Sequence, residues 1–327
     1  AVCQKGSQIS KLIKSPLVGI TKTNIMNIFY RAYQLSSYIK KENIRIIHVS
    51  WTKDLLLSAL VKLFSGNKIS IIYHRQMKIT RYKKDIYHNF IYKSINIVLV
   101  ITKALSEDCK KFLPIDNDRI IKLSYGIALP NNKNTFDKKL LFDEIELQEN
   151  IFTIGVFSRI EEQKGQHLII EALNILHEKN IQLLIVGHCM DISYQNDLRK
   201  MIEKYNMHDR VAFKPFIESP MKIMPMLDLI ILPTYEETFG LVVAESMLMG
   251  TPVIGSNAGG VPEIINDNNN GLLFESRNSK SLSKKILSIY ESEELRIKLS
   301  NNAKIFASEE YNYEKHFSKL TTILQKL

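Results

Sequence analysis

Cysteine is scarce in this 327-residue chain, which contains only Cys3, Cys109 and Cys189. An odd and widely spaced set of three argues against a disulfide framework and against a zinc site. No apolar run approaches the roughly 18 residues of a membrane-spanning helix, and the first ten residues lack the apolar stretch of a signal peptide. Together these absences predict a protein of the cytoplasm.

Acidic residues are scarce in the first part of the chain. Residues 1–140 contain 25 Lys and Arg against 8 Asp and Glu, whereas the remaining residues contain 19 and 26, for a net charge of +10. Such asymmetry favours contact between the first part and an anionic surface, either a membrane leaflet or nucleic acid. A chain that is generally rich in Lys, Ile and Asn would show a basic face without any such partner, and this alternative stays open.

The most basic segment also contains aromatic residues. Residues 73–97 combine six Lys and Arg with Tyr82, Tyr87, Phe90 and Tyr92. This mixture is typical of a segment that lies on anionic lipid. Nucleic-acid binding uses similar residues, but no nucleic-acid-binding motif accompanies them. We expect an anionic membrane surface and no nucleic acid, with an ordinary helix that has a solvated face as the alternative.

Short β-branched runs alternate with amphipathic segments along the whole chain. Near-continuous apolar strands joined by helices indicate parallel sheets covered on both faces. Two such series, separated by the polar residues 130–150, predict two doubly wound α/β domains. The predicted strands are at 44–51, 68–74, 95–102 and 119–126, and then at 151–158, 181–188, 211–216, 227–234, 251–256 and 271–274. Since ligands bind at the carboxyl ends of such strands, residues just after them are site candidates.

Two glutamates follow the strand predicted at 227–234. Glu237 lies in the next loop, and Glu245 lies on the helix that Gly240 opens. Eight helical positions span at most about 12 Å, whereas paired glycosidase carboxylates lie about 5–9.5 Å apart and normally come from different strands. An acid/base pair therefore fits poorly, and a clamp that holds two ends of an extended ligand fits better. Two solvated acids at a helix start remain the alternative for this motif alone.

Two cations follow the first strand of the second series. Arg159, as a fork, and Lys164, as a point charge, suit a diphosphate, although either alone is more often a surface cation. The amide groups of residues 239–241, at a helix N-terminus, also suit an anion. Gly259 and Gly260 follow a third strand and would let a ligand approach the backbone.

The run PTYEETFGLVVAESMLMGTPVIGSNAGGVPEII resembles the signature of retaining glycosyltransferase family 4, which has the GT-B fold of two Rossmann-like domains facing a cleft. The E-x7-E pattern, the Phe-Gly step, GTPV and GGVPE match in order, and SRIEEQKGQHLIIEAL resembles the family's donor-phosphate loop. The resemblance is dense in the second half and loose in the first. It implies an acceptor-binding domain at 1–140, a nucleotide-sugar-binding domain at 141–308, and a terminal helix at 309–327 that packs back on the first domain.

The resemblance also implies roles for the site residues. Glu237 would hold hydroxyls of the donor sugar, Glu245 would bind the ribose, and Arg159 and Lys164 would neutralise the diphosphate. The segment ISIIYHRQM would place His74 near the sugar, with a structural histidine as the alternative. The implied catalytic residues are Glu237, Arg159, Lys164 and His74, and the implied donor-binding residues are Arg159, Lys164, Glu237, Thr238, Phe239, Gly240, Leu241 and Glu245. No metal and no cofactor are expected, because the nucleotide-sugar is a co-substrate.

The activity implied is retaining transfer of a sugar from a nucleotide-sugar, with a UDP-sugar favoured over GDP-mannose, to a glycan or glycolipid. Synthesis of cell-surface polysaccharide or lipopolysaccharide is expected, by a protein in the cytoplasm or on the inner face of the membrane. The alternatives are a non-catalytic scaffold or partner subunit of GT-B shape that binds glycan, and a sugar-nucleotide epimerase or phosphorylase of related fold.

The chain departs from the family pattern at several positions. Tyr125 replaces an Asn, Ser158 replaces a Gly before the phosphate Arg, and Pro215 replaces a Gly near the base pocket, which leaves the base open. The family's opening strand and Gly-rich acceptor loop are absent, so the chain is expected to lack its natural beginning before Ala1. Residues 116–118 have the D-x-D spacing of metal-dependent glycosyltransferases of another fold, but here we predict a turn.

Overall fold

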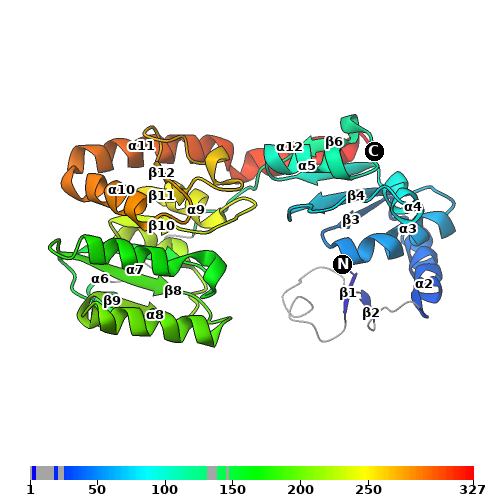
Figure 1. The fold of residues 1–327 in the computed structure, drawn as a ribbon. Coiled ribbons are helices and arrows are strands. Elements are labelled where there is room, and N and C mark those ends of the chain that lie inside the picture. The colour runs from blue at the N-terminus through cyan, green and yellow to red at the C-terminus, as the bar shows by residue number, and fades with distance from the viewer. Residues whose placement is uncertain (1, 5–17, 21–25, 131–137, 145–146) are drawn as a thin grey trace. The chain divides into compact units, whose positions relative to one another are not determined.

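The computed structural model describes residues 2–4, 18–20, 26–130, 138–144 and 147–327 (Figure 1). The chain divides into two compact units. Unit 1 comprises residues 1–100, 105–122 and 322–327, and unit 2 comprises residues 101–104 and 123–321. The strands are β1 (Val2–Gln4), β2 (Val18–Ile20), β3 (Ile46–Val49), β4 (Ser70–Arg75), β5 (Ile97–Val100), β6 (Ile120–Lys122), β7 (Phe152–Phe157), β8 (Ile181–Val186), β9 (Val211–Lys214), β10 (Leu229–Leu232), β11 (Val253–Ser256) and β12 (Leu272–Phe274).

Helices connect most of these strands. They are α2 (Ile28–Lys41), α3 (Leu55–Phe64), α4 (Ile86–Ser94), α5 (Lys103–Phe112), α6 (Lys138–Glu144), α7 (Gln166–Ile175), α8 (Ile192–Lys204), α9 (Leu241–Met249), α10 (Ser279–Glu291), α11 (Glu293–Glu310) and α12 (Tyr313–Gln325). Polar side chains fix several helix starts: Asp85, Asp191, Asn278 and Ser292 each accept a hydrogen bond from a backbone N–H in the first turn of α4, α8, α10 and α11. Among the described residues, no helix has both the length and the apolar character needed to cross a membrane.

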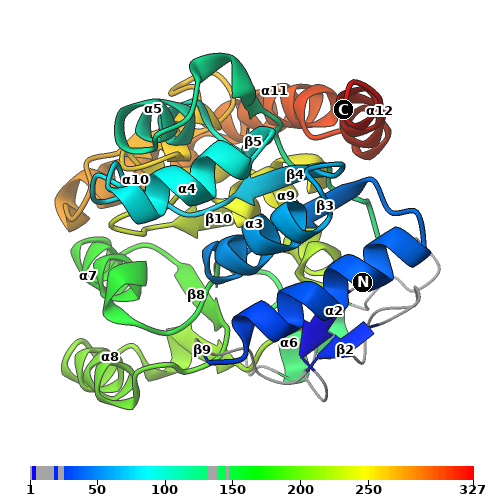
Figure 2. The same cartoon turned by 90° about the vertical axis from the view of Figure 1, so that its right-hand side faces the viewer.

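Unit 1 contains a parallel sheet in the order β3-β4-β5-β6, and β1 and β2 form a separate parallel pair. Helix α3 packs against α2 on one side and α4 on the other (Figure 2). The apolar side chains of α2 that face α3 are Ile28, Ala32, Leu35 and Ile39. The four strands predicted between residues 44 and 126 are confirmed.

Unit 2 contains a six-stranded parallel sheet in the order β12-β11-β10-β7-β8-β9. The strand order reverses between β7 and β10, because β8 and β9 continue on one side of β7 and β10 to β12 on the other. Since crossovers between parallel strands are right-handed, this reversal places α7 and α8 on one face and α9 on the opposite face. The prediction of two parallel-sheet α/β domains is confirmed.

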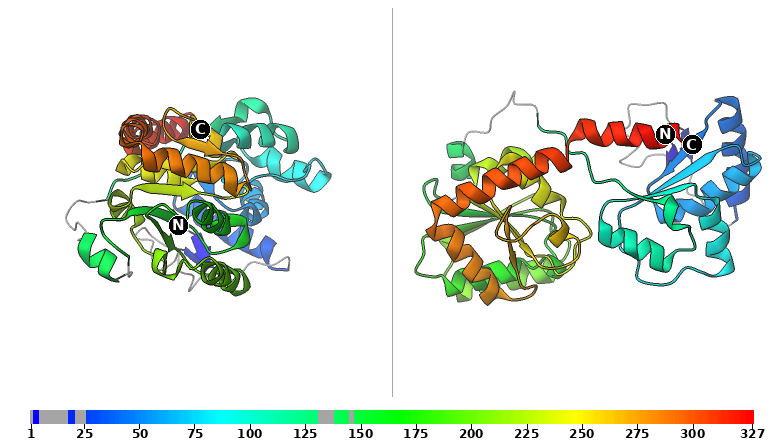
Figure 3. Two further views of the ribbon diagram at one scale, coloured as in Figure 1. Left: turned by 60° about the vertical axis from the view of Figure 1, so that its left-hand side comes forward. Right: turned by 90° about the horizontal axis from the view of Figure 1, so that it is seen from above.

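The core of unit 2 lies between the sheet and its helices. Strands β7 and β8 contribute fully buried aliphatic side chains, such as Ile154, Val156 and Leu183, to a cluster that also contains Leu173 of α7 and Ile286 of α10. Helix α7 packs against α8 and α10, while α9 packs against α11 (Figures 1 and 3). Because both faces of the sheet are covered in this way, the loops at the carboxyl edge remain as the place for a ligand.

Candidate functional site

Two loops of unit 2 meet where the strand order reverses. One follows β7 and contains Arg159 and Lys164, and the other follows β10 and contains Glu237. The Tyr235 N–H donates to the Gln163 carbonyl oxygen at 2.9 Å, and the Thr234 hydroxyl donates to the same oxygen at 3.3 Å. In open α/β sheets the reversal point is the usual ligand crevice. The backbone therefore fixes the two loops to each other at the position where a ligand is expected.

Both predicted cations pair with a carboxylate. Lys164 Nζ lies 2.9 Å from Glu237 Oε2, and these side chains are only 17% and 24% exposed. Arg159 lies 2.8 Å from Glu161 Oε1, with the arginine side chain 56% exposed. The structure thus places the side chains of Lys164 and Glu237 in contact. Glu161 was not among the predicted site residues, although it stands two positions after Arg159 in the phosphate-loop motif.

Helix α9 begins at the edge of this pair. Its N-cap is Gly240, which has a left-handed φ of +93° that L side chains rarely adopt. The Thr238 N–H donates to Glu237 Oε1 at 3.2 Å, whereas the amides of Leu241 and the next residue lie in the first turn, where no intrahelical acceptor is available. Partial positive charge at this helix start adds to that of the two cations. Phe239 is 5% exposed, so its ring belongs to the core and its backbone amide is the part left for a ligand.

Gly259 and Gly260 pack directly on the backbone of the Glu237 loop. A Cβ on Gly259 would lie 2.1 Å from the Glu237 carbonyl oxygen, and a Cβ on Gly260 would lie 2.1 Å from the Thr238 carbonyl oxygen. The Gly260 N–H donates to the Glu237 carbonyl at 2.7 Å. The sequence suggested that these glycines admit a ligand, and the close approach that the structure shows is to protein backbone. Their lack of side chains allows the third loop to hold Glu237 in place.

Glu245 lies on α9 in a different environment. Its carboxylate accepts no hydrogen bond from any residue that the structure describes, and burial raises the pKa of Glu245 to about 7. A half-buried carboxyl group without donors favours a ligand that supplies hydroxyl groups. The two glutamates therefore differ. Glu237 is paired with a cation, whereas Glu245 has no hydrogen-bond donor among the described residues. This difference fits a clamp better than an acid/base pair.

Aromatic side chains from the segment after β6 and from the end of α11 support the Glu237 loop. The ring of Tyr125 packs edge-on against Phe239 with 5.0 Å between centroids, and Phe239 packs against Tyr311 at 5.5 Å. Burial, with a smaller effect from the charge of Glu237, raises the pKa of the Tyr125 phenol. Tyr125, which stands where the family pattern has Asn, thus lies within electrostatic range of Glu237 in unit 2.

One histidine that was not among the predicted site residues joins three parts of the site. His167, one turn after Lys164, has Nδ1 2.8 Å from the Tyr194 hydroxyl and Nε2 2.7 Å from the Tyr235 hydroxyl. The Arg277 guanidinium lies 4.4 Å from the Tyr235 ring centroid. Burial lowers the pKa of His167. Tyr235 is therefore held at its backbone, its hydroxyl and its ring, which restrains the segment leading to Glu237.

Two other predictions concern unit 1. His74 lies in β4, is 9% exposed, and stacks on His48 with 5.7 Å between ring centroids. A role for His74 near the sugar stays a prediction. The D-x-D segment is confirmed as a turn: a 3-10 turn spans Asn117–Arg119, and Arg119 pairs with Asp116 at 3.1 Å. Within the described parts of the chain, no group of three or more His, Cys, Asp or Glu side chains is placed to hold a metal ion.

The fold is similar to solved glycosyltransferase structures. A glycosyltransferase from Rickettsia africae superposes with a TM-score of 0.89 at 21% identity, covering 98% of this chain and 88% of that one. The Anabaena protein HepE, solved in complex with UDP and glucose, superposes with a TM-score of 0.82 at 20% identity, covering 95% and 86%. Two parallel-sheet units with a loop site at the reversal point therefore define a protein of the GT-B class.

The family follows from the sequence of the second half. Residues 137–306, which are more than half of the chain, match the family of glycosyl transferases group 1. The chain belongs to this family of glycosyltransferases.

Similar curated proteins have several different activities. N-acetyl-alpha-D-glucosaminyl L-malate synthase of Bacillus anthracis is 24% identical over 89% of this chain and 77% of its own length. The O-antigen biosynthesis glycosyltransferase WclY of Escherichia coli is 29% identical over 49% of this chain and 43% of its own length. An uncharacterized glycosyltransferase of Methanocaldococcus jannaschii, MJ1178, is 27% identical over 66% of this chain and 62% of its own length.

Glu245 predicts a pH-dependent stability. Its pKa of about 7 in the folded protein exceeds the ordinary 4.5, so folding takes up a proton between these pH values. The free energy of unfolding should therefore fall as the pH rises from about 4.5 to about 7, by at most about 3 kcal/mol from this group. In Glu245→Gln, urea unfolding at pH 5 and pH 8 should show a correspondingly smaller difference than in the wild type. An equal difference in both proteins would show that Glu245 is ionised normally.

Proposed function

We propose that the protein is a retaining glycosyltransferase of family 4 that moves a hexosyl group from a UDP-sugar to a hydroxyl of a glycan or glycolipid. The observation that carries this proposal is the cluster at the strand-order reversal: Lys164 paired with Glu237, Arg159 on the same loop, and the start of α9 beside them. Two cations and a helix N-terminus match the charge of a diphosphate. The E-x7-E pattern of Glu237 and Glu245 supports the assignment to family 4.

Binding of the donor exchanges one anion for another at each cation. The diphosphate takes the place of Glu161 at Arg159 and of Glu237 at Lys164, so neither cation becomes unpaired in the process. Glu237, once released from Lys164, is free to accept hydrogen bonds from sugar hydroxyls. The ribose hydroxyls supply Glu245 with the donors that it lacks among the described residues.

The reaction needs charge stabilisation more than a protein base. As the sugar–phosphate bond breaks, negative charge grows on the diphosphate beside Arg159, Lys164 and the amides after Gly240. The acceptor hydroxyl attacks from the face that the leaving group occupies, and its proton passes to the departing phosphate, which retains the configuration. This course requires no dedicated carboxylate base, in keeping with a Glu237 that pairs with a cation. We assign His74 of unit 1 to the sugar end of the site.

The choice of donor and process is supported by similar proteins. HepE was solved with UDP and glucose, which favours a UDP-sugar over GDP-mannose. WclY serves O-antigen biosynthesis, and a neighbour of TM-score 0.73 is the lipopolysaccharide galactosyltransferase WaaB. We therefore propose that the protein acts in cell-surface polysaccharide or lipopolysaccharide synthesis in the cytoplasm. The same assignment makes the first domain the acceptor-binding part.

Glu237→Gln tests the role of the reacting-end carboxylate. The variant keeps the shape of the side chain but loses the charge, so turnover with the true donor should fall at least roughly 100-fold, in the range found when one group that stabilises the transition state is removed. UDP binding, measured by calorimetry, should persist because Lys164 is freed from its internal partner. Glu236→Gln, at the exposed neighbouring position, serves as the matched control. Turnover near the wild-type value in Glu237→Gln would disprove the assignment.

Arg159 and Glu161 should respond to mutation in opposite directions. Arg159→Ala removes stabilisation of the leaving diphosphate and should lower kcat by about 10²–10³, or about 2.7–4 kcal/mol. Glu161→Gln removes the anion that competes for Arg159, so UDP should bind up to roughly fivefold more tightly, since an exposed ion pair contributes about 1 kcal/mol or less. Turnover assays measure the first effect and isothermal titration with UDP the second. Weaker UDP binding in Glu161→Gln would refute the exchange of anions.

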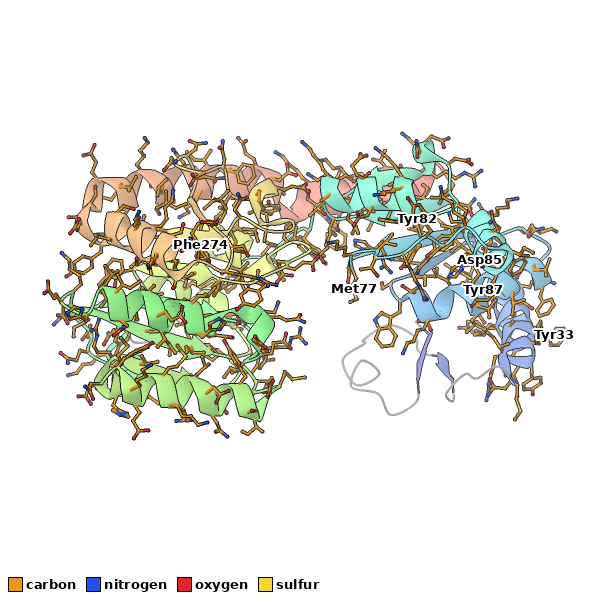
Figure 4. All side chains as sticks on the ribbon, viewed as in Figure 1. Tyr33, Met77, Tyr82, Asp85, Tyr87 and Phe274 are labelled. Carbon is orange, nitrogen blue, oxygen red and sulfur yellow. The ribbon has the colours of Figure 1, made fainter. Side chains whose placement is uncertain are left out.

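We also propose that unit 1 contacts an anionic membrane through α4 and the loop before it. The side chains of Met77, Tyr82 and Tyr87 are exposed there (Figure 4), as are Ile86 and Phe90. Ile86 is 91% exposed at the first turn of α4. Exposed apolar and aromatic side chains beside Arg and Lys match the chemistry of a lipid surface with anionic headgroups.

The membrane contact should depend on exposed charge and on salt. Lys84, which is exposed and lies 5.8 Å from the Tyr82 ring centroid, is the position to reverse. Lys84→Glu should weaken binding to phosphatidylglycerol vesicles, measured by co-sedimentation, roughly tenfold, since each basic residue near the surface contributes about 1 kcal/mol. Raising the ionic strength should weaken wild-type binding as well. Lys298→Glu, in unit 2, provides the control. Vesicle binding that is unaffected by Lys84→Glu and by salt would refute this contact.

A further inference from the structure

Arg75 is a cation held in place by neutral groups. It ends β4, and its Nη1 donates to the Thr52 hydroxyl at 2.6 Å and to the Tyr73 hydroxyl at 2.8 Å. Its Nη2 donates to the Lys78 carbonyl oxygen at 2.8 Å. Within the described residues, the buried Nε–H of Arg75 has no acceptor. These contacts orient the guanidinium at the carboxyl edge of the sheet but leave its charge uncompensated.

Lys83 lies close enough to Arg75 for the two positive charges to repel each other. Its backbone N–H donates to the Phe112 carbonyl oxygen at 2.9 Å, and the neighbouring Tyr82 ring packs edge-on against Phe112 at 5.0 Å. The backbone is therefore anchored while the side chain is half-buried. Burial lowers the pKa of Lys83, and the charges of Arg75 and Arg81 lower it further. The folded protein thus keeps a partly desolvated ammonium group next to two like charges.

No carboxylate among the described residues forms an ion pair with this cluster. Among the ion pairs between described residues, none includes Arg75, Arg81 or Lys83. The part of unit 1 that the structure leaves undescribed contains no Asp or Glu in its sequence, so it cannot supply one. Charged side chains are rarely buried without a partner, because removing a charge from water is costly. A bound anion would supply the missing compensation.

Lys62 of unit 1 is an example of a lysine with a structural role. Burial also lowers the pKa of Lys62, with a smaller effect from Arg119. The Lys62 ammonium, however, donates to the Ser94 carbonyl oxygen and to Asn96 Oδ1, both at 2.8 Å. The Lys83 ammonium has no such acceptor among the described residues. The hydrogen bonds of the Lys62 ammonium are thus made within the fold, whereas the Lys83 ammonium can still accept a ligand as its partner.

We propose that Lys83, supported by Arg75, binds a phosphate or diphosphate group on the acceptor. The inference rests on the proposed function, in which the first domain holds the acceptor. Lys83 contacts the anion directly, and Arg75 adds charge from a fixed position beside it. A phosphate with a charge near −2 matches two cations better than one carboxylate does. The site lies at the carboxyl edge of β4, where parallel sheets bind their ligands.

The test separates this site from the donor site. The protein is first saturated with UDP, which occupies the cations of unit 2, and pyrophosphate is then titrated calorimetrically. Wild type and Lys84→Gln should bind one equivalent of pyrophosphate, and Lys83→Gln should bind it at least tenfold more weakly. Lys83→Arg should restore most of the affinity. Lys84 is the matched control, because it is adjacent, exposed and equally charged. Equal weakening in Lys83→Gln and Lys84→Gln would overturn the proposal, as would no pyrophosphate binding in the wild type.

Two further measurements distinguish the acceptor site from a structural lysine and from a lipid contact. Because Lys83 is repelled by two neighbours, Lys83→Gln should unfold at the same temperature as the wild type or higher; a lower temperature would assign Lys83 a structural role instead. A phosphate could also belong to a lipid headgroup. Lys83→Gln should weaken binding to phosphatidylglycerol vesicles by no more than the roughly fivefold that one basic residue contributes, and a larger loss of vesicle binding with intact pyrophosphate binding would overturn the acceptor assignment. Failure of UDP to bind at the first step would instead contradict the proposed function.

Discussion

The backbone hydrogen bonds of residues 235–238 are the constraint on which the site depends. On one side, Tyr235 donates to Gln163 of the loop after β7, and on the other, Gly260 of the loop after β11 donates to Glu237. Gly259 and Gly260 can come this close only because they have no Cβ. Three loops are thus fixed to one another through backbone groups and glycines, which have no side-chain rotamers. A carboxylate placed in this way keeps its position without relying on flexible side chains.

The electrostatics of the site follow from this rigid frame. Lys164 and Glu237 are mostly buried, so removing either one would leave a largely desolvated charge without its partner. Arg159 and Glu161 are paired closer to solvent, where the energy of an ion pair is small. An incoming anion therefore displaces Glu161 more easily than Glu237. In the proposed function, the outer cation would capture the diphosphate first, and the inner pair would act in the step that positions the sugar.

Much of this arrangement could be predicted from the sequence, because strand ends determine which loops share a sheet edge. Apolar runs located the strands, and Arg159, Lys164 and Glu237 followed from their places just after strands. The partners of these residues were not predictable in the same way. Glu161 faces Arg159 only through the local loop geometry, and His167 reaches Tyr194 and Tyr235 across different elements. The contact of Gly259 with Glu237 depends on how two loops approach, which no spacing along the chain encodes.

The half-buried carboxyl group of Glu245 links ligand capture to the acidity of the surroundings. A group with a pKa of about 7 is divided between its acid and its anion at neutral pH. A ligand whose hydroxyls donate to the anion draws the group towards ionisation and so expels a proton as it enters. Mass action then makes capture more favourable as protons become scarce. In the proposed function, this one carboxylate on α9 would release a proton when the nucleotide binds, separately from any proton exchanged in the chemical step.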